Sequence, residues 1–327
     1  MKSFKVGTFN LYNLVLPNHT YYGNRKYSVE DFGRKVQWIR NQVEEMDTQI
    51  MGFQEVFHKE ALVTALGSTS FSAEDIHVFG ETGNSPVVGL ASTFPLAGEA
   101  ESISRIPEEV TESIEGVAGH YKTFSRPVLK ARLKLAEEVM ATVIVAHLKS
   151  KRPSIAEGED DDDFLVQAIG QTRSLLRRSV EATGLRKLVL DALSENNDPV
   201  IVLGDLNDAT RSVTNSIIAG PMPWKFDSKA NKKKHWDRAL YSAFDIISLK
   251  SYKNEWPTHI YNGNYESLDH IYVSQEFFFR NKERLGDVNF VHVLDDHLKD
   301  DTLSRDKLPK WQSDHGQVVA SIRFRDE

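Results

Sequence analysis

The sequence contains no cysteine among its 327 residues. Disulfide bridges, thiolate metal sites and cysteine nucleophiles are therefore excluded, because each of them needs a thiol. A long apolar run is also missing. The longest apolar stretch, residues 139–146, is interrupted by Thr142 and is far shorter than the roughly 20 residues that cross a bilayer as a helix. We expect no membrane span.

Targeting and linker segments are missing as well. The N-terminus lacks the apolar core and cleavage site of a signal peptide, so a cytoplasmic location is the default expectation. A trimmed secreted protein would begin in the same way. No Pro/Gly/Ser-rich stretch divides the chain, and we expect one domain over residues 1–327.

Three common catalytic motifs are absent. The chain has neither G-x-x-x-x-G-K-[ST] nor G-x-G-x-x-G, which argues against nucleotide-driven transfer and dinucleotide chemistry. Ser313-Asp314-His315 has the residue types of a serine hydrolase, but no G-x-S-x-G elbow accompanies it. We therefore exclude a serine hydrolase.

The charge balance is acidic, with 40 Lys and Arg against 47 Asp and Glu and a net charge of −7. Such a balance argues against coating nucleic acid through bulk charge, but not against an enzyme that binds a few phosphates locally. Part of the excess lies in Glu157, Glu159 and Asp160 to Asp163. We expect residues 154–163 to form a solvated, mobile acidic loop.

Two stretches have helical periodicity. From residue 29 to 46, apolar residues recur at spacings of three and four, and Ser28 with Asp31 forms a variant of the capping box in front of them. A second helix is expected from about Asp163 into the 190s, with Gly184 as a candidate interruption.

Short β-branched runs predict strands between these helices. The expected strands are 4–9, 49–53, 87–91, 128–135, 139–146, 200–203, 270–273 and 317–324. Several are apolar on both faces, as expected for strands buried between layers. Some connections are too short for parallel crossovers, so we expect mixed sheets.

Polar residues stand where these strands end or begin. Those that follow a strand are Asn10, Glu55, His147, Asp205 and Asn207, and those that precede one are Asp269, Asp314 and His315. In a mixed sheet, the ends of strands running one way meet the starts of strands running the other way. All eight side chains can therefore gather on one rim.

The chemistry of this set indicates a hard metal ion and a phosphoester. Carboxylate and amide oxygens favour Mg²⁺ or Mn²⁺. A metal ion beside imidazoles and a carboxylate base is what in-line attack of water on phosphorus needs.

Each residue alone has a simpler interpretation. Asn10 after a strand is usually part of an Asx-turn, and Glu55 could cap a following helix. His147 could be a hydrogen-bonded histidine at a strand end, and residues 204–208 form a good turn by composition. Only the presence of all these residues together, at the ends of strands, favours a catalytic site.

In this order, the segments resemble the endonuclease/exonuclease/phosphatase superfamily, the deoxyribonuclease-I-like enzymes, and most of all its bacterial nuclease-like branch. The matching segments are Thr8-Phe9-Asn10-Leu11, Gln54-Glu55, Ser125-Arg126-Pro127, Ala146-His147-Leu148-Lys149-Ser150, Gly204-Asp205-Leu206-Asn207, Ser267-Leu268-Asp269-His270-Ile271 and Ser313-Asp314-His315. They extend from residue 8 to residue 315.

The resemblance implies an α/β fold, a four-layer α/β/β/α sandwich of two mixed sheets packed face to face with helices outside. It also implies a hydrolase of phosphoester bonds that uses Mg²⁺, with Mn²⁺ or Ca²⁺ as possible substitutes. Glu55 would bind the metal ion, helped by Asn10 and Asp314.

The same resemblance assigns roles to the other residues. Asp205 would orient and deprotonate the attacking water, and Asn207 would hold the phosphate or the water. His315, oriented by Asp269, would bind the phosphate and stabilise its developing charge, while His147 would assist at the phosphate or leaving group. Two further groups are expected to contact the substrate phosphate, Arg126 and Lys149.

The substrate is left open between two classes. Basic and aromatic residues in the second half suit a nucleic-acid strand, although lysine runs are often solvated loops and tryptophans often pack in the core. The residues concerned are Lys149, Lys151, Arg152, Arg211, the expected basic loop Lys232–His235, Trp224, Trp236, Trp256, Tyr261 and Tyr265.

The first hypothesis is therefore a nuclease or phosphodiesterase that acts on nucleic acid. The alternative is a phosphatase or phosphodiesterase for a small phosphorylated metabolite or lipid headgroup. A non-catalytic relative would have lost a catalytic residue, and all eight are present. No obligate protein partner is indicated.

Overall fold

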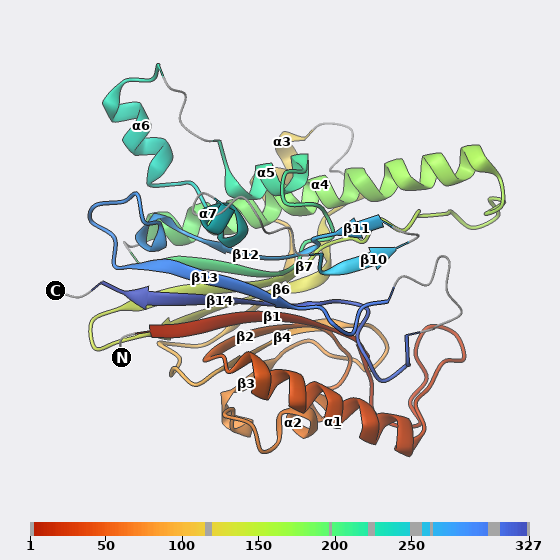
Figure 1. The fold of residues 1–327 in the computed structure, drawn as a ribbon. Coiled ribbons are helices and arrows are strands. Elements are labelled where there is room, and N and C mark those ends of the chain that lie inside the picture. The colour runs from red at the N-terminus through yellow and green to blue at the C-terminus, as the bar shows by residue number, and fades with distance from the viewer. Residues whose placement is uncertain are drawn as a thin grey trace.

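Two six-stranded sheets lie face to face, with helices on the outside of the pair (Figure 1). The computed structural model describes residues 3–114, 120–195, 198–221, 226–248, 257–261, 264–299 and 308–325. The order of the layers in Figure 1 is helices, sheet, sheet, helices, and both sheets are mixed. The fold predicted from the sequence is confirmed.

The first sheet joins the two ends of the chain. Its strand order is β13-β14-β1-β2-β4-β3. The strands are β1 (Ser3–Leu14), β2 (Ile50–Val56), β3 (Ile76–Val78), β4 (Val87–Ser92), β13 (Gly286–Leu294) and β14 (Gln317–Phe324). Only the β1–β2 pair is parallel among the strand pairs described for this sheet.

The second sheet comes from the middle of the chain, in the order β5-β6-β7-β8-β12-β9. Its strands are β5 (Glu101–Arg105), β6 (Thr123–Lys134), β7 (Met140–His147), β8 (Val200–Asp205), β9 (Tyr241–Ser242) and β12 (Asp269–Val273). The β7–β8 pair is parallel. A separate hairpin, β10 (His259–Tyr261) and β11 (Asn264–Glu266), lies at the end of the sandwich (Figure 1).

Helices cover both outer faces. On the first sheet lie α1 (Val29–Met46) and α2 (Lys59–Leu66), and a short 3-10 turn, η1 (Ala73–Asp75), precedes β3. On the side of the second sheet lie α3 (Glu108–Ser113), α4 (Phe164–Glu195) and α5 (Val213–Ala219). The remaining elements are α6 (Lys229–Trp236), α7 (Ala243–Ser248) and the 3-10 turn η3 (Gln275–Phe277).

The alternation of side chains along the strands builds three apolar layers. In β1, Phe4 and Val6 point into the core between the sheets, whereas Phe9 and Leu11 point towards α1 and α2. A third cluster joins the second sheet to α4 and α5. Because successive residues of a strand face opposite sides, a strand that is apolar on both faces can serve two cores at once.

The first predicted helix is confirmed, including its start. Ser28 is the N-cap of α1, and its side chain accepts a hydrogen bond of 3.0 Å from the backbone of Asp31. Such a cap satisfies one of the free N–H groups of the first turn.

The second predicted helix is confirmed, but its expected interruption is wrong. Helix α4 continues through Gly184. A Cβ at this position would lie 3.0 Å from both Ile106 and Phe124. The glycine therefore allows close packing on the helix rather than breaking it.

The predicted basic loop at Lys232–His235 is also wrong, because these residues belong to α6. The acidic segment 154–163 is tied to α4. Glu159 accepts two hydrogen bonds from Arg173, at 2.5 and 2.7 Å, and the backbone N–H of Ser154 donates to Gly170. Among the helices described, none is long and apolar enough to cross a membrane.

Candidate active site

Four polar side chains lie at strand ends, on the same strand faces as the apolar residues of the core between the sheets. In β8, Leu203 belongs to this core and Asp205 is the next residue on the same face. The same period of two places Asn10 near the end of β1, His147 at the end of β7 and Asp269 at the start of β12. All four therefore point into the gap between the sheets at one rim, as predicted.

Asp205 is the centre of this group and is almost fully buried. Its Oδ2 accepts a hydrogen bond of 3.0 Å from Asn10 Nδ2, and its Oδ1 accepts one of 2.9 Å from the backbone of Asn207. Nε2 of His147 lies 3.4 Å from Oδ2, and Nε2 of His315 lies 3.9 Å from it. Burial raises the pKa of Asp205, and His315 acts in the opposite direction.

His315 forms a pair with Asp269. Its Nδ1 lies 2.7 Å from Oδ2 of Asp269, and both residues are buried. Burial disfavours the charged ring, but the carboxylates of Asp269 and Asp205 outweigh it, so the pKa of His315 is well above its usual value. The two carboxylates thus favour the protonated ring, whose Nε2 lies on the side of Asp205.

His147 has the opposite electrostatic character. Burial, assisted by the positive charges of Arg126 and His315, holds its pKa well below the usual value. Its Nδ1 has no hydrogen-bond partner among the described residues. A neutral and a charged imidazole thus flank the same carboxylate.

Glu55 reaches the rim through an unusual backbone conformation. It has φ of 62°, at an irregularity in the pairing of β2, and Oε2 accepts a hydrogen bond of 2.8 Å from the backbone of Asn13. A non-glycine residue in this region is strained and is often found at a functional site. The strain turns the side chain towards the rim rather than the helix layer.

Glu55 and Asp314 form the acidic part of the site. Burial and then Asp314 raise the pKa of Glu55, which is the sign of two carboxylates that repel one another. Oδ1 of Asp314 has no hydrogen-bond partner in the described part of the chain. A divalent cation would neutralise this excess charge, and the oxygen donors fit a hard ion. These two residues, with Asn10 nearby, could hold a metal ion.

The Gly204-Asp205-Leu206-Asn207 turn has a steric origin. Gly204 has φ of 147°, and a Cβ there would lie 1.9 Å from the carbonyl oxygen of Ala146. Asn207 has φ of 55° and donates from Nδ2 to the carbonyl of Leu148 at 3.1 Å. The turn thus ties the end of β8 to the end of β7, and only glycine fits at its first position.

The two expected phosphate ligands lie close to the rim. Nη1 of Arg126 donates to the carbonyl of Leu148 at 3.3 Å. Nζ of Lys149 donates to the carbonyls of Ser150 and Arg152, at 3.2 and 3.1 Å. Burial, followed by the neighbouring arginines, lowers the pKa of Lys149 to about 8. The phosphate-binding role of both residues stays a prediction.

Glu181 of α4 was not predicted and supports both of these positions. Its carboxylate accepts hydrogen bonds from the backbone and hydroxyl of Ser125 at 2.8 and 2.5 Å, and from the backbone of Lys149 at 2.7 Å. Arg177 adds a bond of 3.2 Å. In the sequence, Arg177 and Glu181 have the i,i+4 spacing of an ordinary surface ion pair on one helix face. Nothing in the sequence therefore indicates that Glu181 is buried.

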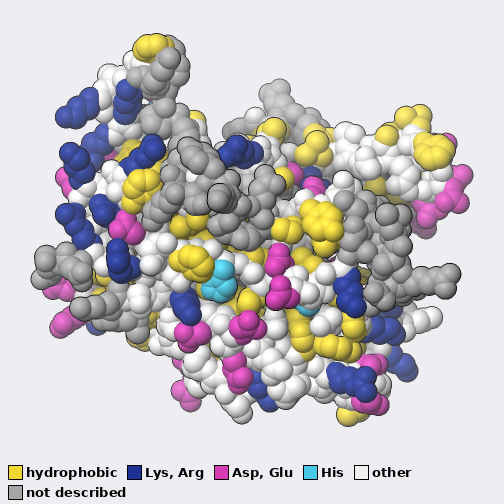
Figure 2. All heavy atoms as spheres, in the orientation of Figure 1, with side chains coloured by type: hydrophobic (Ala, Val, Ile, Leu, Met, Phe, Trp, Pro, Cys, Tyr) yellow, Lys and Arg dark blue, Asp and Glu magenta, His cyan; other side chains and the backbone are white. Residues whose placement is uncertain are grey.

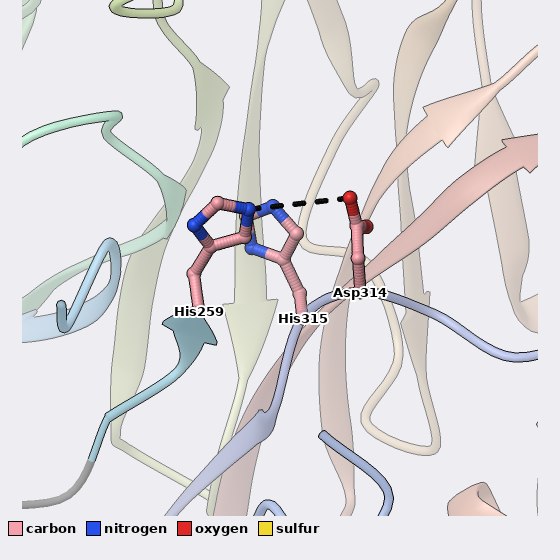
Figure 3. Close-up of side chains that lie close together, drawn as sticks. All are labelled: His259, Asp314 and His315. Carbon is pink, nitrogen blue, oxygen red and sulfur yellow. Dashed lines mark ion pairs between the residues drawn. The ribbon is translucent and has the colours of Figure 1, made fainter. Parts of the chain in front are cut away.

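His259 was also missed. Figure 3 shows its ring beside the ring of His315, with Asp314 close to both. The ring centroids are 4.8 Å apart, and Nε2 of His259 lies 4.0 Å from Oδ2 of Asp314. The only signal in the sequence is its place in the aromatic stretch before Asp269, and that stretch contains several equivalent candidates.

The other candidates for substrate contact have different surroundings. Trp236 is partly buried and packs against Tyr241 and Phe278 at the edge of the core. Tyr261 and Tyr265 are exposed on the hairpin. Trp224 and Trp256 lie outside the described residues.

The lysines of α6 lie away from the site. Figure 2 shows Lys and Arg side chains gathered at the upper left, over α6, whereas the β10–β11 hairpin beside the site lies on the right of Figure 1. They cannot line the rim.

The sequence matches the model of the endonuclease/exonuclease/phosphatase family over residues 7–315. No curated protein sequence matches the chain. Several solved structures share the fold. The endonuclease/exonuclease/phosphatase from Beutenbergia cavernae DSM 12333 has a TM-score of 0.51 at 13% identity, over 99% of this chain and 72% of that chain.

Two further structures cover nearly the whole of both chains. Humanized D. rerio TDP2 has a TM-score of 0.57 at 11% identity, over 98% of this chain and 99% of that chain. The human Nocturnin catalytic domain with bound sulfate has a TM-score of 0.52 at 16% identity, over 99% and 95%. At these identities the likeness concerns the fold alone.

Proposed function

The chain belongs to the endonuclease/exonuclease/phosphatase family of phosphoester-hydrolysing enzymes, and from this premise we propose that it is a Mg²⁺-dependent phosphodiesterase that cleaves nucleic acid. One observation supports the proposal most strongly. The buried carboxylate of Asp205 lies between a neutral and a charged imidazole, next to the acidic pair Glu55 and Asp314.

Asp205 accepts the proton of the attacking water. Its carboxylate is held on one oxygen by Asn10 and on the other by the backbone of Asn207. Its raised pKa makes it a stronger base than an exposed aspartate, and a general base that is fixed in place accelerates a reaction by about 10² to 10⁴.

His315 stabilises the charge that develops on the phosphate oxygens. An imidazolium placed in advance, in a site that excludes water, stabilises a transition state more than a neutral ring does. Asp269 keeps the ring charged and fixes its orientation. Neutral His147 donates a hydrogen bond to the phosphate or leaving group, and Arg126 and Lys149 bind a phosphate oxygen.

Glu55 and Asp314 would hold the Mg²⁺ ion, with Asn10 as a third ligand. When bound, this ion supplies charge neutralisation and Lewis acidity at the phosphate. Without it, the two carboxylates repel the anionic substrate. Activity should therefore be lost in EDTA and restored by Mg²⁺ or Mn²⁺.

The test compares the wild-type protein with Asp205→Asn, which keeps the shape of the side chain but removes the base. Supercoiled plasmid, single-stranded RNA and a panel of small phosphomonoesters and diesters are incubated with Mg²⁺ or with EDTA. We expect metal-dependent cleavage of nucleic acid that falls by about 10² to 10⁴ in the variant.

Asp198→Asn is the matched control, because Asp198 precedes the opposite end of the same strand β8 and pairs with Arg132. It should retain wild-type activity. Activity that survives Asp205→Asn would overturn the mechanism. Turnover confined to small esters would favour the alternative, a phosphatase or phosphodiesterase for a small metabolite or lipid headgroup.

A further inference from the structure

Three rings form a row that leads from the active site to the surface. The ring of His315 lies beside that of His259, with centroids 4.8 Å apart (Figure 3). The ring of Tyr261 follows, 6.3 Å from that of His259 and inclined to it by only 18°. Tyr261 is 64% exposed. The row therefore begins at His315 in the candidate active site and ends at the exposed ring of Tyr261.

The hairpin that carries this row is fastened to catalytic segments. Oγ1 of Thr258 accepts a hydrogen bond of 3.2 Å from the backbone of Asp269, and its carbonyl accepts one of 2.7 Å from Gly316. On the second strand, Glu266 accepts a bond of 2.6 Å from Lys151. These contacts set the position of the hairpin relative to His315 and to the segment after His147.

We propose that the β10–β11 hairpin forms a nucleoside subsite next to the scissile phosphate. The base stacks on the exposed face of Tyr261, and His259 contacts the sugar of the same nucleotide. This inference rests on the proposed function and narrows its substrate class to esters that carry a nucleobase. Every base has a π-face, so stacking on a tyrosine binds nucleotides without selecting a sequence.

A headgroup or sugar phosphate makes less use of this row of rings than a nucleotide does. Such ligands lack the planar π-face of a nucleobase, so they gain less from stacking on an exposed ring. Oδ2 of Asp269 is bonded to His315, and both carboxylate oxygens of Asp205 accept hydrogen bonds within the protein. The surface next to the phosphate is aromatic instead.

The hairpin provides its own control residue. Tyr261 pairs with Asn264, whereas Tyr265 pairs with Ile260, so the two tyrosines lie on opposite faces of the hairpin. Tyr265 is 60% exposed, close to the value for Tyr261. Tyr265→Ala thus removes a similarly exposed ring from the same hairpin, but from the face opposite to Tyr261.

The experiment measures kcat and KM with Mg²⁺ on two chains that share one backbone. One is a single-stranded oligothymidylate, and the other is the same sugar–phosphate chain with tetrahydrofuran residues in place of the nucleosides. We expect Tyr261→Ala to raise KM on oligothymidylate about tenfold, since stacking of one base is worth about 1–3 kcal/mol. On the base-free chain KM should not change.

Two further variants complete the set. Tyr261→Phe keeps the ring and should behave as the wild type, as should Tyr265→Ala. His259→Gln should raise KM on both chains, because its contact is with the sugar. An unchanged KM in Tyr261→Ala, or an equal rise on the base-free chain or in Tyr265→Ala, would overturn the subsite. An unchanged KM in His259→Gln would remove His259 from it.

Failure of this inference can be told apart from failure of the proposed function. If the wild-type protein cleaves both chains with the same KM, the phosphodiesterase stands and the nucleoside subsite falls. If it cleaves neither chain and also leaves plasmid DNA and RNA intact in Mg²⁺ or Mn²⁺, the proposed function falls and the subsite with it.

Discussion

His315 depends on Asp269 for its charge. The two side chains are 2.7 Å apart in a place where burial alone would favour the neutral ring. Such a pair is a positioning device as well as an electrostatic one, since the bond at Nδ1 decides which nitrogen faces the substrate.

Asp269→Asn should move the basic limb of the pH profile. A group with a raised pKa keeps its proton below that pKa and loses it as the pH rises through it. Removing the carboxylate lowers the pKa of His315, so kcat/KM should begin to fall at a lower pH than in the wild type. The measurement is kcat/KM against pH, with Asp198→Asn as the control. An unmoved basic limb would contradict the role given to the pair.

Gly204→Ala should be far more damaging than an ordinary glycine substitution. The added Cβ would lie 1.9 Å from a backbone oxygen of the adjacent strand, and a backbone cannot move aside as a side chain can. We expect a loss of more than about 3 kcal/mol in the free energy of unfolding, measured in urea.

Gly98→Ala is the matched control for Gly204. Gly98 also has positive φ, at 124°, but within the described part of the chain, its direct neighbours aside, no atom lies within 4 Å of its virtual Cβ. Gly98→Ala should cost only the backbone strain, about 1–3 kcal/mol. Similar losses at both positions would mean that strain, and not the close approach of β7 to β8, explains the glycine.

Single residues were predictable where a strand pattern pointed to them. Asp205 and His147 end apolar strands and have the residue types of a phosphoesterase, so their place on the rim followed from the sequence. His259 reaches His315 through a hairpin packed against distant segments. No local pattern encodes such a contact, and it could not be predicted.

Among the elements, helix α4 links the outer layer to the site. Its residues Arg178 and Glu181 hold the backbone on both sides of Lys149, with Arg178 donating to the carbonyl of Lys149 and Glu181 accepting from its N–H. The segment after His147 is therefore clamped by the helix that covers the sheet.

Glu181→Ala should lower both activity and stability. It leaves the buried backbone donors of Ser125 and Lys149 unpaired, and each unsatisfied donor costs about 1–3 kcal/mol. We expect a clear fall in the free energy of unfolding, and a fall in kcat/KM from misplacement of Arg126. Glu181→Gln, which keeps an acceptor, should restore part of both.

Asp191→Ala serves as the control on the same helix. Asp191 pairs with Lys187 at the surface, and such pairs contribute at most about 1 kcal/mol. If Asp191→Ala and Glu181→Ala lose the same stability and activity, the bridge made by Glu181 has no special role.

The strands of the two sheets that the sequence did not predict have a common position. The outermost strands of the two sheets are β13, β3, β5 and β9, and all four were missed. Strands β3 and β9 are only three and two residues long, and β5 has no buried residue, so none of these three has an extended apolar pattern. The central strands were predicted because burial on both faces imposes an apolar run.

At the scale of the whole molecule, one cluster of positive charge lies away from the rim. The lysines of α6 lie at the far end of the sandwich from the β10–β11 hairpin (Figures 1 and 2). The combined variant with Lys232→Ser, Lys233→Ser and Lys234→Ser should keep the wild-type kcat/KM on a short oligonucleotide. Arg126→Ala should raise KM on the same substrate, because Arg126 is beside His147. A similar loss in both variants would place α6 in the path of the substrate.

The two-sheet architecture could be predicted from the sequence. Which site residue of one sheet contacts which residue of the other sheet could not. Asn10 comes from the first sheet and Asp205 from the second, and a hydrogen bond of 3.0 Å joins them. Neither strand pattern indicates which residue of the opposite sheet it will meet. That pairing depends on how the two inner faces interlock, which is a property of the whole core.

Because this hydrogen bond joins the two sheets, catalytic activity depends on the position of one sheet relative to the other. The first and last strands of the chain build one half and its middle builds the other, so neither half holds a complete set of catalytic groups. A small displacement of one sheet relative to the other would separate Asp205 from the side-chain amide of Asn10, while every strand stayed intact. On gentle heating, enzymatic activity should therefore be lost at a lower temperature than the far-ultraviolet circular dichroism signal of the strands. The difference between the two temperatures measures how readily the sheets are displaced relative to each other.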